Sequence, residues 1–225
     1  MEKELIEKIV QPYINEKYLF ERFMNGIVDT FVLEPTLNQY GNPIIHTVKH
    51  RLKNVEHLKE KIQRKWDVEN PLTPENLFER VTDLAGVRVL HLYQDQFEAI
   101  HNLITKQIEN GDWVYHENPV AYSWDPESRQ YFEGLELTPK IKDSYYTSIH
   151  YVVKPKSDSN ICCEIQVRTL FEEIWGEIDH TINYPSPTDN KACREQLRVL
   201  SKLVSTGTRL ADSIFRTHME TFKHE

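Results

Sequence analysis

Residues Ile161–Tyr184 read ICCEIQVRTLFEEIWGEIDHTINY, and the spacing of their apolar side chains changes part-way along. Up to Val167 the residues alternate between the two sides of an extended chain. One side is apolar, with Cys163, Ile165 and Val167, and the other is polar, with Glu164, Gln166 and Arg168. From Leu170 the apolar spacing lengthens to about 3.6 residues, the period of a helix. The stretch therefore predicts a strand whose polar face lines a cleft, followed directly by a helix.

The predicted helix also has two faces. Its apolar arc is formed by six side chains, Leu170, Phe171, Ile174, Trp175, Ile178 and Ile182. Glu173, Glu177 and His180 fall on the other side of the helix. Glu177 and His180 also have the E-x-x-H spacing of half a carboxylate-bridged iron site, but such a site needs a second E-x-x-H motif on a facing helix, and we do not expect an iron site here.

Two further strands are predicted upstream. Asp83–Leu92, DLAGVRVLHL, is typical of a buried strand, within which Arg88 is unexpected because burying an unpaired arginine is costly. Ser144–Val153, SYYTSIHYVV, places Tyr146 and His150 on one face of a strand. Either pattern, taken alone, also fits an ordinary amphipathic strand.

A basic segment precedes these strands. Between His46 and Trp66 there are seven Lys or Arg residues against two Glu, although the whole chain has a formal net charge of −8. Asn54 is a credible N-cap for a helix in this segment, with Arg51 and Lys53 at the helix start. A basic segment in an acidic protein suits a compact polyanion such as a nucleotide better than a nucleic-acid backbone. A solvated helix face is the alternative explanation.

Composition narrows the class of protein further. The 225 residues, 39% hydrophobic and 28% charged, are enough for one domain with a core of its own. The sequence shows no apolar signal region and no membrane-spanning run, and its three cysteines lack metal-ligand spacing, so we expect a cytoplasmic protein. The common glycine-rich nucleotide loops are absent. No His-Asp dipeptide occurs, which argues against a metal-dependent hydrolase.

Taken together, the motifs resemble the synthetase domain of the RelA/SpoT family, whose members make the alarmone (p)ppGpp. The resemblance rests on Arg51–Lys53 (RLK), Asp83–Arg88 (DLAGVR), Tyr145–His150 (YYTSIH) and the EIQVRT…W…E-x-x-H stretch, in that order. It implies an α/β fold of the nucleotidyltransferase kind, with a mixed, largely antiparallel sheet of about five strands flanked by helices. We expect an N-terminal helical segment at 1–43, a synthetase core at 44–184 and a C-terminal helix at 185–225.

The resemblance also implies a role for each motif. Asp83 and Glu164 would hold Mg²⁺, and Glu164 would also accept the proton of a ribose 3′-hydroxyl. The implied ATP ligands are Arg51, Lys53, Lys61 and Arg88. The implied acceptor ligands are Tyr146, His150, Gln166, Arg168 and His180. The expected reaction moves pyrophosphate from ATP to GDP or GTP, so ATP and a guanine nucleotide are the expected partners.

At the acceptor motif the chain departs from the family pattern. Tyr145 stands where the family has glycine, which leaves the identity of the acceptor open. A toxin-like relative that modifies tRNA 3′ ends or adenine nucleotides is one alternative, and a non-catalytic nucleotide-binding regulator is another. Residues 112–143 are predicted to be either a mobile substrate loop or a hairpin with loops. The helix predicted from Lys191 would pack on the domain or join copies in a homo-oligomer.

Overall fold

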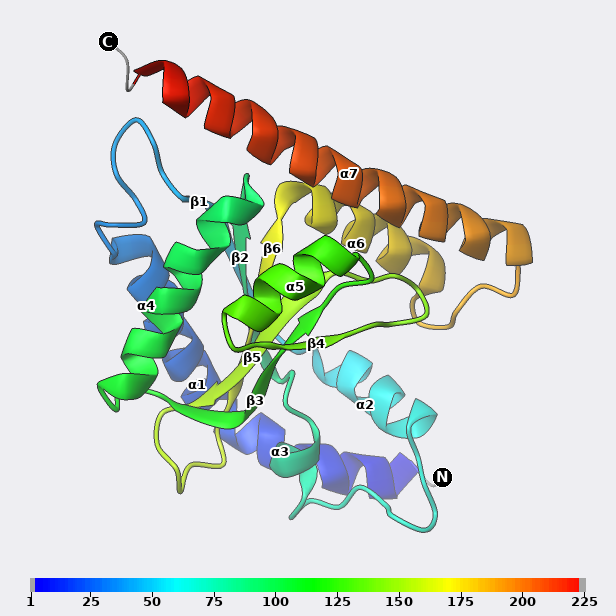
Figure 1. Cartoon of the computed structure of the whole chain (residues 1–225). Coiled ribbons are helices and arrows are strands. Elements are labelled where there is room, and N and C mark those ends of the chain that lie inside the picture. Colours follow the sequence, from blue (N-terminus) through cyan, green and yellow to red (C-terminus); the bar gives the residue numbers. More distant parts are fainter. Residues whose placement is uncertain (1–2, 223–225) are drawn as a thin grey trace.

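A six-stranded sheet forms the centre of the computed structural model, which describes residues 3–222 (Figure 1). The strands are β1 (Ile45–Leu52), β2 (Ala85–His91), β3 (Val114–Tyr122), β4 (Thr138–Lys140), β5 (Ser148–Lys154) and β6 (Cys163–Thr169). Their order is β1-β2-β6-β5-β3-β4. The β2–β6 and β3–β4 pairs are parallel and the other pairs are antiparallel. The predicted mixed α/β sheet is confirmed, with one strand more than expected.

Helices surround the sheet. They are α1 (Lys3–Leu33), α2 (Val55–Arg64), α3 (Leu77–Arg80), α4 (Phe97–Glu109), α5 (Pro126–Gly134), α6 (Leu170–Asn183) and α7 (Lys191–Phe222), with a 3₁₀ turn η1 (Gln94–Gln96). Residues 1 and 2 of the predicted N-terminal helical segment lie outside the described residues. Between Lys3 and Phe222, no helix is both long enough and apolar enough to cross a membrane.

The parallel pair β2–β6 sets the position of the two predicted acids. Gly86 near the start of β2 lies opposite Glu164 near the start of β6. Parallel neighbours run in the same direction, so both strands begin at the same edge of the sheet. Asp83 comes just before β2, and it therefore reaches the same edge as Glu164.

Alternation along these two strands separates a core face from a polar face. Val87, Val89, Ile165 and Val167 are fully buried in the hydrophobic core, which α1 helps to cover. Burying each such side chain contributes about 1.5–3 kcal/mol to folding. The intervening polar residues Arg88, Glu164 and Gln166 are only partly buried and line a cavity. The alternation predicted for residues 162–167 is thus confirmed.

The basic segment folds partly as predicted. Asn54 caps α2, because its side-chain oxygen accepts hydrogen bonds from the amides of Glu56 (2.8 Å) and His57 (3.4 Å). The predicted place of Arg51 at the helix start is wrong, since Arg51 lies in β1 opposite Gly86. β1 continues through Arg51 because its pairing with β2 extends to Leu52.

For residues 112–143, both predictions were wrong. The segment forms β3, then α5, then β4, rather than a mobile loop or a hairpin. The Asp125 carboxylate caps α5 by accepting from the Ser128 amide at 3.0 Å, and Pro126 occupies the first helical turn. A proline there needs no hydrogen-bond partner for its nitrogen, which favours a helix start at this point.

The switch from strand to helix after β6 has a local cause. Thr169 and Glu172 form a capping box, in which Glu172 accepts from the Thr169 amide at 2.7 Å and Thr169 accepts from the Glu172 amide at 3.3 Å. The predicted apolar arc of α6 is buried at Trp175, but Phe171, Ile174 and Ile178 are exposed.

α7 lies along α6 and spans one side of the molecule (Figure 1). Its buried face carries Leu197, Ser201, Val204 and Thr208. Leu203, Leu210 and Ile214 of the same helix are more than 60% exposed. The predicted packing on the domain is confirmed, and a second apolar stripe points outward.

Candidate active site

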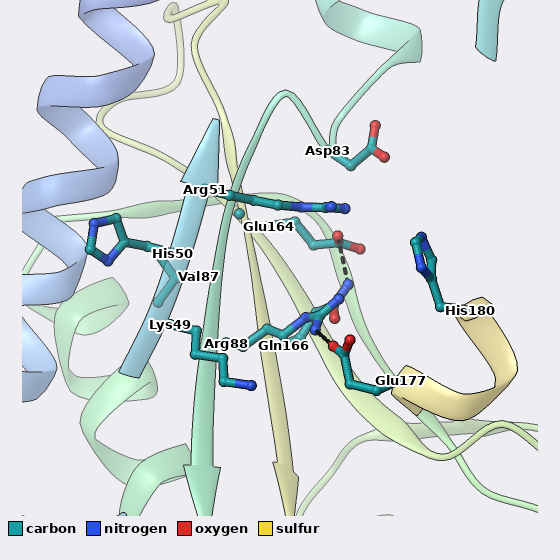
Figure 2. A pocket seen from close by; sticks show the side chains of 11 residues that line it. Lys49, His50, Arg51, Asp83, Val87, Arg88, Glu164, Gln166, Glu177 and His180 are labelled. Carbon is teal, nitrogen blue, oxygen red and sulfur yellow. Dashed lines mark hydrogen bonds and ion pairs between the residues drawn. The ribbon is translucent and has the colours of Figure 1, made fainter. Parts of the chain in front are cut away.

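A cavity of about 250 Å³ opens beside β1, β2 and β6 (Figure 2). Among the predicted site residues, its lining includes Arg51, Asp83, Arg88, Glu164, Gln166 and His180. Lys49, His50 and Glu177 also line it. Asp83, just before β2, and Glu164, in β6, therefore share one cavity with several cations.

Asp83 is held by two lysines. Lys53 donates to its Oδ2 at 2.7 Å and Lys61 donates to its Oδ1 at 2.6 Å. Burial alone would raise the pKa of Asp83, but the charges of Lys61 and Lys53 outweigh it and lower the pKa to about 2. Asp83 is therefore ionised, and the two lysines predicted to bind ATP form ion pairs with it.

Tyr13 of α1 supports this cluster, and the sequence did not indicate it. Its hydroxyl donates to the carbonyl oxygens of Lys53 (2.8 Å) and Leu84 (3.3 Å). The side chain is fully buried, and burial raises the pKa of Tyr13 to about 12. Tyr13 thus ties the backbone beside Lys53 to the backbone beside Asp83.

Glu164 is oriented by two hydrogen bonds. His150 Nδ1 lies 2.8 Å from Oε1, and Gln166 Nε2 donates to Oε2 at 2.9 Å. Burial would raise the pKa of Glu164, but its hydrogen bonds with His150 and Gln166 lower that pKa below its usual range. The carboxylate is consequently ionised at neutral pH.

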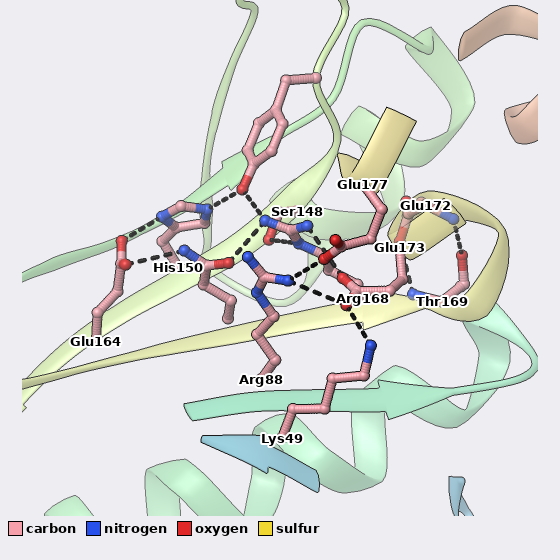
Figure 3. Close-up of polar contacts among 12 residues, drawn as sticks. Lys49, Arg88, Ser148, His150, Glu164, Arg168, Thr169, Glu172, Glu173 and Glu177 are labelled. Carbon is pink, nitrogen blue, oxygen red and sulfur yellow. Dashed lines mark hydrogen bonds and ion pairs between the residues drawn. The ribbon is translucent and has the colours of Figure 1, made fainter. Parts of the chain in front are cut away.

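His150 links Glu164 to Tyr146. Figure 3 shows its contact with Glu164. Its Nε2 lies 2.8 Å from the Tyr146 hydroxyl. Burial lowers the pKa of His150, which favours the neutral ring despite the neighbouring carboxylate. A neutral ring with its proton on Nδ1 donates to Glu164 and accepts from Tyr146. This arrangement holds the acid in one orientation.

Arg168 is buried and fully engaged with protein groups. It donates to Ser148 Oγ (3.1 Å), Gln166 Oε1 (2.7 Å), Glu173 Oε2 (3.2 Å) and the Tyr146 hydroxyl. These contacts make Arg168 an anchor that joins β5, β6 and α6, and the residue also lines a second cavity.

Glu173 is the centre of a cation cluster that the sequence did not assign to the site (Figure 3). Its carboxylate lies 3.0 Å from Lys49 Nζ, 3.1 Å from Arg88 Nη1 and 3.2 Å from Arg168 Nη1. Burial would raise the pKa of Glu173, but the hydrogen bond from Lys49 and the charges of the two arginines lower it. Glu177, which is more exposed, also accepts from Arg88 at 2.7 Å.

The second cavity, of about 300 Å³, adjoins the first through the shared residues Arg88 and His180. Its other lining residues are Arg64, Tyr146, Arg168, Gly176, Asp179, Asn183 and Tyr184. The His180 ring stacks on Tyr184 with centroids 4.6 Å apart. The Lys142 ammonium lies 4.2 Å from the ring centroid of Tyr146 and 4.0 Å from that of Tyr122. A cavity with aromatic and cationic side chains in its lining therefore borders the cavity that contains Asp83 and Glu164.

Gly176 leaves the space that Arg168 needs. A Cβ atom at Gly176 would lie 2.7 Å from Arg168 Nη1, and the hydrogen bonds of that guanidinium restrict its movement. We expect Gly176→Ala to destabilise the protein by about 1–3 kcal/mol, as overpacking does. Gly26→Ala in α1 is the matched control, because nothing lies within 4 Å of its added Cβ. Chemical denaturation measures both variants, and equal stability of the two would contradict the proposed clash.

Asp83 and Glu164 suit a magnesium ion better than a metal that is bound entirely by protein side chains. Within residues 3–222, no group of three or more His, Cys, Asp or Glu side chains is arranged to hold a metal. Mg²⁺ commonly takes only one or two carboxylates, with phosphate oxygens and water completing its shell. Asp83 and Glu164, both ionised and lining one cavity, provide such a pair.

The acid pair, the surrounding cations and the mixed sheet define a protein of the nucleotide-dependent transferase class. Residues 50–189 match the family model described as the region found in RelA / SpoT proteins, and the chain belongs to this family. The chain is 25% identical over 192 residues to the GTP pyrophosphokinase YwaC of Bacillus subtilis (strain 168), a match that covers 82% of this chain and 80% of the relative.

Solved structures share the fold. The small alarmone synthetase 1 from Bacillus subtilis superimposes with a TM-score of 0.67 at 22% identity, covering 95% of this chain and 97% of that one. A GTP pyrophosphokinase family protein from Streptococcus pneumoniae gives 0.66 at 22% identity, covering 98% and 97%. The same Bacillus enzyme bound to its product pppGpp gives 0.63 at 22% identity, covering 95% and 96%.

Proposed function

We propose that this protein transfers pyrophosphate from ATP to the ribose 3′-hydroxyl of GDP or GTP, which makes (p)ppGpp. One observation carries the proposal. Asp83 and Glu164 line the same cavity together with Arg51 and Arg88, in a chain whose relatives are GTP pyrophosphokinases. An ionised acid pair beside fixed cations suits phosphoryl chemistry, in which catalysis is mainly positioning and electrostatics.

Glu164 is the proposed base. Its ionised carboxylate, oriented by His150 and Gln166, accepts the proton of the acceptor's 3′-hydroxyl. The 3′-oxygen attacks the β-phosphorus of ATP in line, and the new O–P bond forms as the bond to the α,β-bridging oxygen breaks. AMP leaves with that bond's electron pair. Arg51 and Arg88 neutralise the charge that spreads over the transferred group.

The donor side is proposed to use Arg51, Lys53, Lys61 and Arg88. Lys53 and Lys61 lie on the Asp83 carboxylate, so their ammonium groups are within reach of phosphates placed beside that acid. Asp83 and Glu164 would hold Mg²⁺, which when bound offsets the negative charge of the ATP phosphates. Lys–Asp83 pairing also keeps Asp83 ionised before the metal arrives.

The acceptor is proposed to occupy the second cavity. Tyr146 and His180 offer aromatic surfaces to a base, and the neighbouring Arg64 and Arg88 offer positive charge to phosphates. Gln166 and Arg168 support this side through hydrogen bonds to Glu164 and Tyr146. Because Tyr145 replaces the family glycine, an adenine nucleotide or a tRNA 3′ end is the second candidate acceptor. The net charge of −8 disfavours tRNA.

We further propose that residues 44–184 form the catalytic core and that copies of the chain associate. Phe171, Ile174 and Ile178 of α6, with Leu203, Leu210 and Ile214 of α7, are 37–63% exposed. Apolar side chains clustered on two packed helices are typical of protein contacts.

Since ATP and guanine nucleotides are cytoplasmic metabolites, we place the protein in the cytoplasm.

The test is transfer of label from β-labelled ATP, with Mg²⁺, to GDP, GTP, ADP or deacylated tRNA offered separately. We expect labelled ppGpp or pppGpp, equimolar AMP and no product after chelation of the metal. Labelled tRNA or an adenine product alone would select the second candidate. Tight ATP binding without AMP release from any mixture would contradict catalysis and favour a regulatory nucleotide-binding role.

A further inference from the structure

Tyr145 has a backbone conformation that a tyrosine rarely adopts. Its φ is +61°, in the left-handed region, where side chains other than glycine are strained. Such strain persists only where the surroundings fix the residue. This position is also the one at which the chain has tyrosine in place of the glycine of its family.

The backbone around Tyr145 is held by α7. Ser201 Oγ donates to the Tyr145 carbonyl oxygen at 2.7 Å, and Ser201 is only 1% exposed. Arg198, nearly one turn earlier in α7, donates from Nε to the Asp143 carbonyl oxygen at 2.9 Å. The Tyr145 amide itself donates to the Lys142 carbonyl oxygen at 2.9 Å, which closes the turn. Residues of a single helix therefore fix two carbonyl groups of this turn.

The Tyr145 ring is held as well. It stacks on Trp124 with centroids 5.5 Å apart and an interplanar angle of 29°. The guanidinium of Arg198 lies 5.6 Å from the ring centroid, and the ammonium of Lys202 lies 5.7 Å from it. Cations at these distances are attracted to the face of an aromatic ring. A glycine at this position would make none of these contacts.

The turn that α7 holds connects to the second cavity, because Tyr146 lines that cavity and Lys142 contacts the Tyr146 ring. Lys142 opens the turn and Tyr146 follows it, and the Lys142 ammonium lies 4.2 Å from the Tyr146 ring centroid. The Tyr146 hydroxyl contacts His150, which orients Glu164. A shift of the turn would therefore move the aromatic wall of the second cavity and disturb the base. Arg51, on β1, and Asp83, just before β2, line the first cavity instead.

We propose that Tyr145 is a positioning residue and that Arg198, Ser201 and Lys202 of α7 form a clamp that sets the acceptor side of the site. The proposal rests on the proposed function for the identity of the acceptor. In this proposal, Tyr145 lacks the conformational freedom of a glycine but gains ring contacts with Arg198 and Lys202 of α7. The C-terminal helix then contributes to acceptor binding without touching the acceptor.

The test compares Ser201→Ala with Tyr145→Phe in the full chain. Ser201→Ala removes one hydrogen bond to the turn, and we expect the KM for GDP to rise roughly 2- to 10-fold while the KM for ATP is unchanged. Tyr145→Phe keeps the ring contacts, and we expect wild-type constants. Tyr145→Gly suits the left-handed backbone but loses the ring, so it should raise the KM for GDP while folding as stably as the wild type.

Hydrogen–deuterium exchange of residues 142–147 gives a second readout that needs no turnover. Exchange in this segment should increase in Ser201→Ala and Tyr145→Gly and stay at the wild-type level in Tyr145→Phe. Unchanged exchange in Ser201→Ala, or equal changes in the KM values for GDP and ATP, would overturn the proposal. If the wild type forms no product, the proposed function fails, and GDP binding by calorimetry together with exchange still decides whether the clamp controls acceptor affinity.

Discussion

Glu164→Gln is expected to lower the kcat of pyrophosphate transfer by about 10²–10⁴-fold, the usual contribution of a positioned general base. Glutamine keeps the size of the side chain but cannot take the 3′-hydroxyl proton. It also replaces one carboxylate oxygen by an NH₂ group. That donor would face the donor of either His150 Nδ1–H or Gln166 Nε2. Steady-state assays with β-labelled ATP measure the change, and the KM for ATP should shift much less than kcat.

Glu177→Gln is the matched control for this prediction. Glu177 lines the same cavity, but its side chain is 57% exposed and pairs with Arg88 at 2.7 Å. We expect it to retain kcat within a few-fold of the wild type. Comparable activity of Glu164→Gln and Glu177→Gln would remove Glu164 from the proposed role, provided that both variants melt at the wild-type temperature.

The position of the acid pair could be predicted from the sequence because it depends on local patterns. The alternation around Glu164 and the apolar strand after Asp83 identify two strands with polar faces. Family order then implies that the two acids meet, and the parallel pairing of Gly86 with Glu164 confirms that they share one edge. The N-cap of α2 at Asn54 is local in the same way.

The supporting contacts could not be predicted, because they join residues that are distant in the sequence. Tyr13 reaches Lys53 and Leu84 only after α1 packs on the sheet. Glu173 reads as part of an acidic helix face until α6 folds back over β1 and β2. The replacement of the family glycine by Tyr145 was the one sign in the sequence of an unusual backbone at this position. Its partners in α7 could not be predicted, because that helix lies about fifty residues further along the chain.

Glu173→Ala is expected to be the most destabilising single change at the site. The carboxylate is 5% exposed and contacts three cations, of which Arg168 is equally buried. Removing one partner of a buried ion pair leaves uncompensated charge and costs about 3–5 kcal/mol. Activity should fall with stability, because Arg88 and the Arg168–Tyr146 contact lose the group that fixes them. Chemical denaturation gives the change in the free energy of unfolding.

Glu177→Ala is the control that separates the effect of removing a buried carboxylate from the effect of removing any carboxylate that pairs with Arg88. Both glutamates lie on α6 and both pair with Arg88, at 3.1 Å and 2.7 Å, but only Glu173 is buried. An exposed ion pair contributes about 0–1 kcal/mol, so Glu177→Ala should unfold close to the wild type. If the two variants lose equal stability, the buried cluster is not what joins α6 to the sheet. In that case Thr169 capping and Trp175 packing must hold the helix beside the site instead.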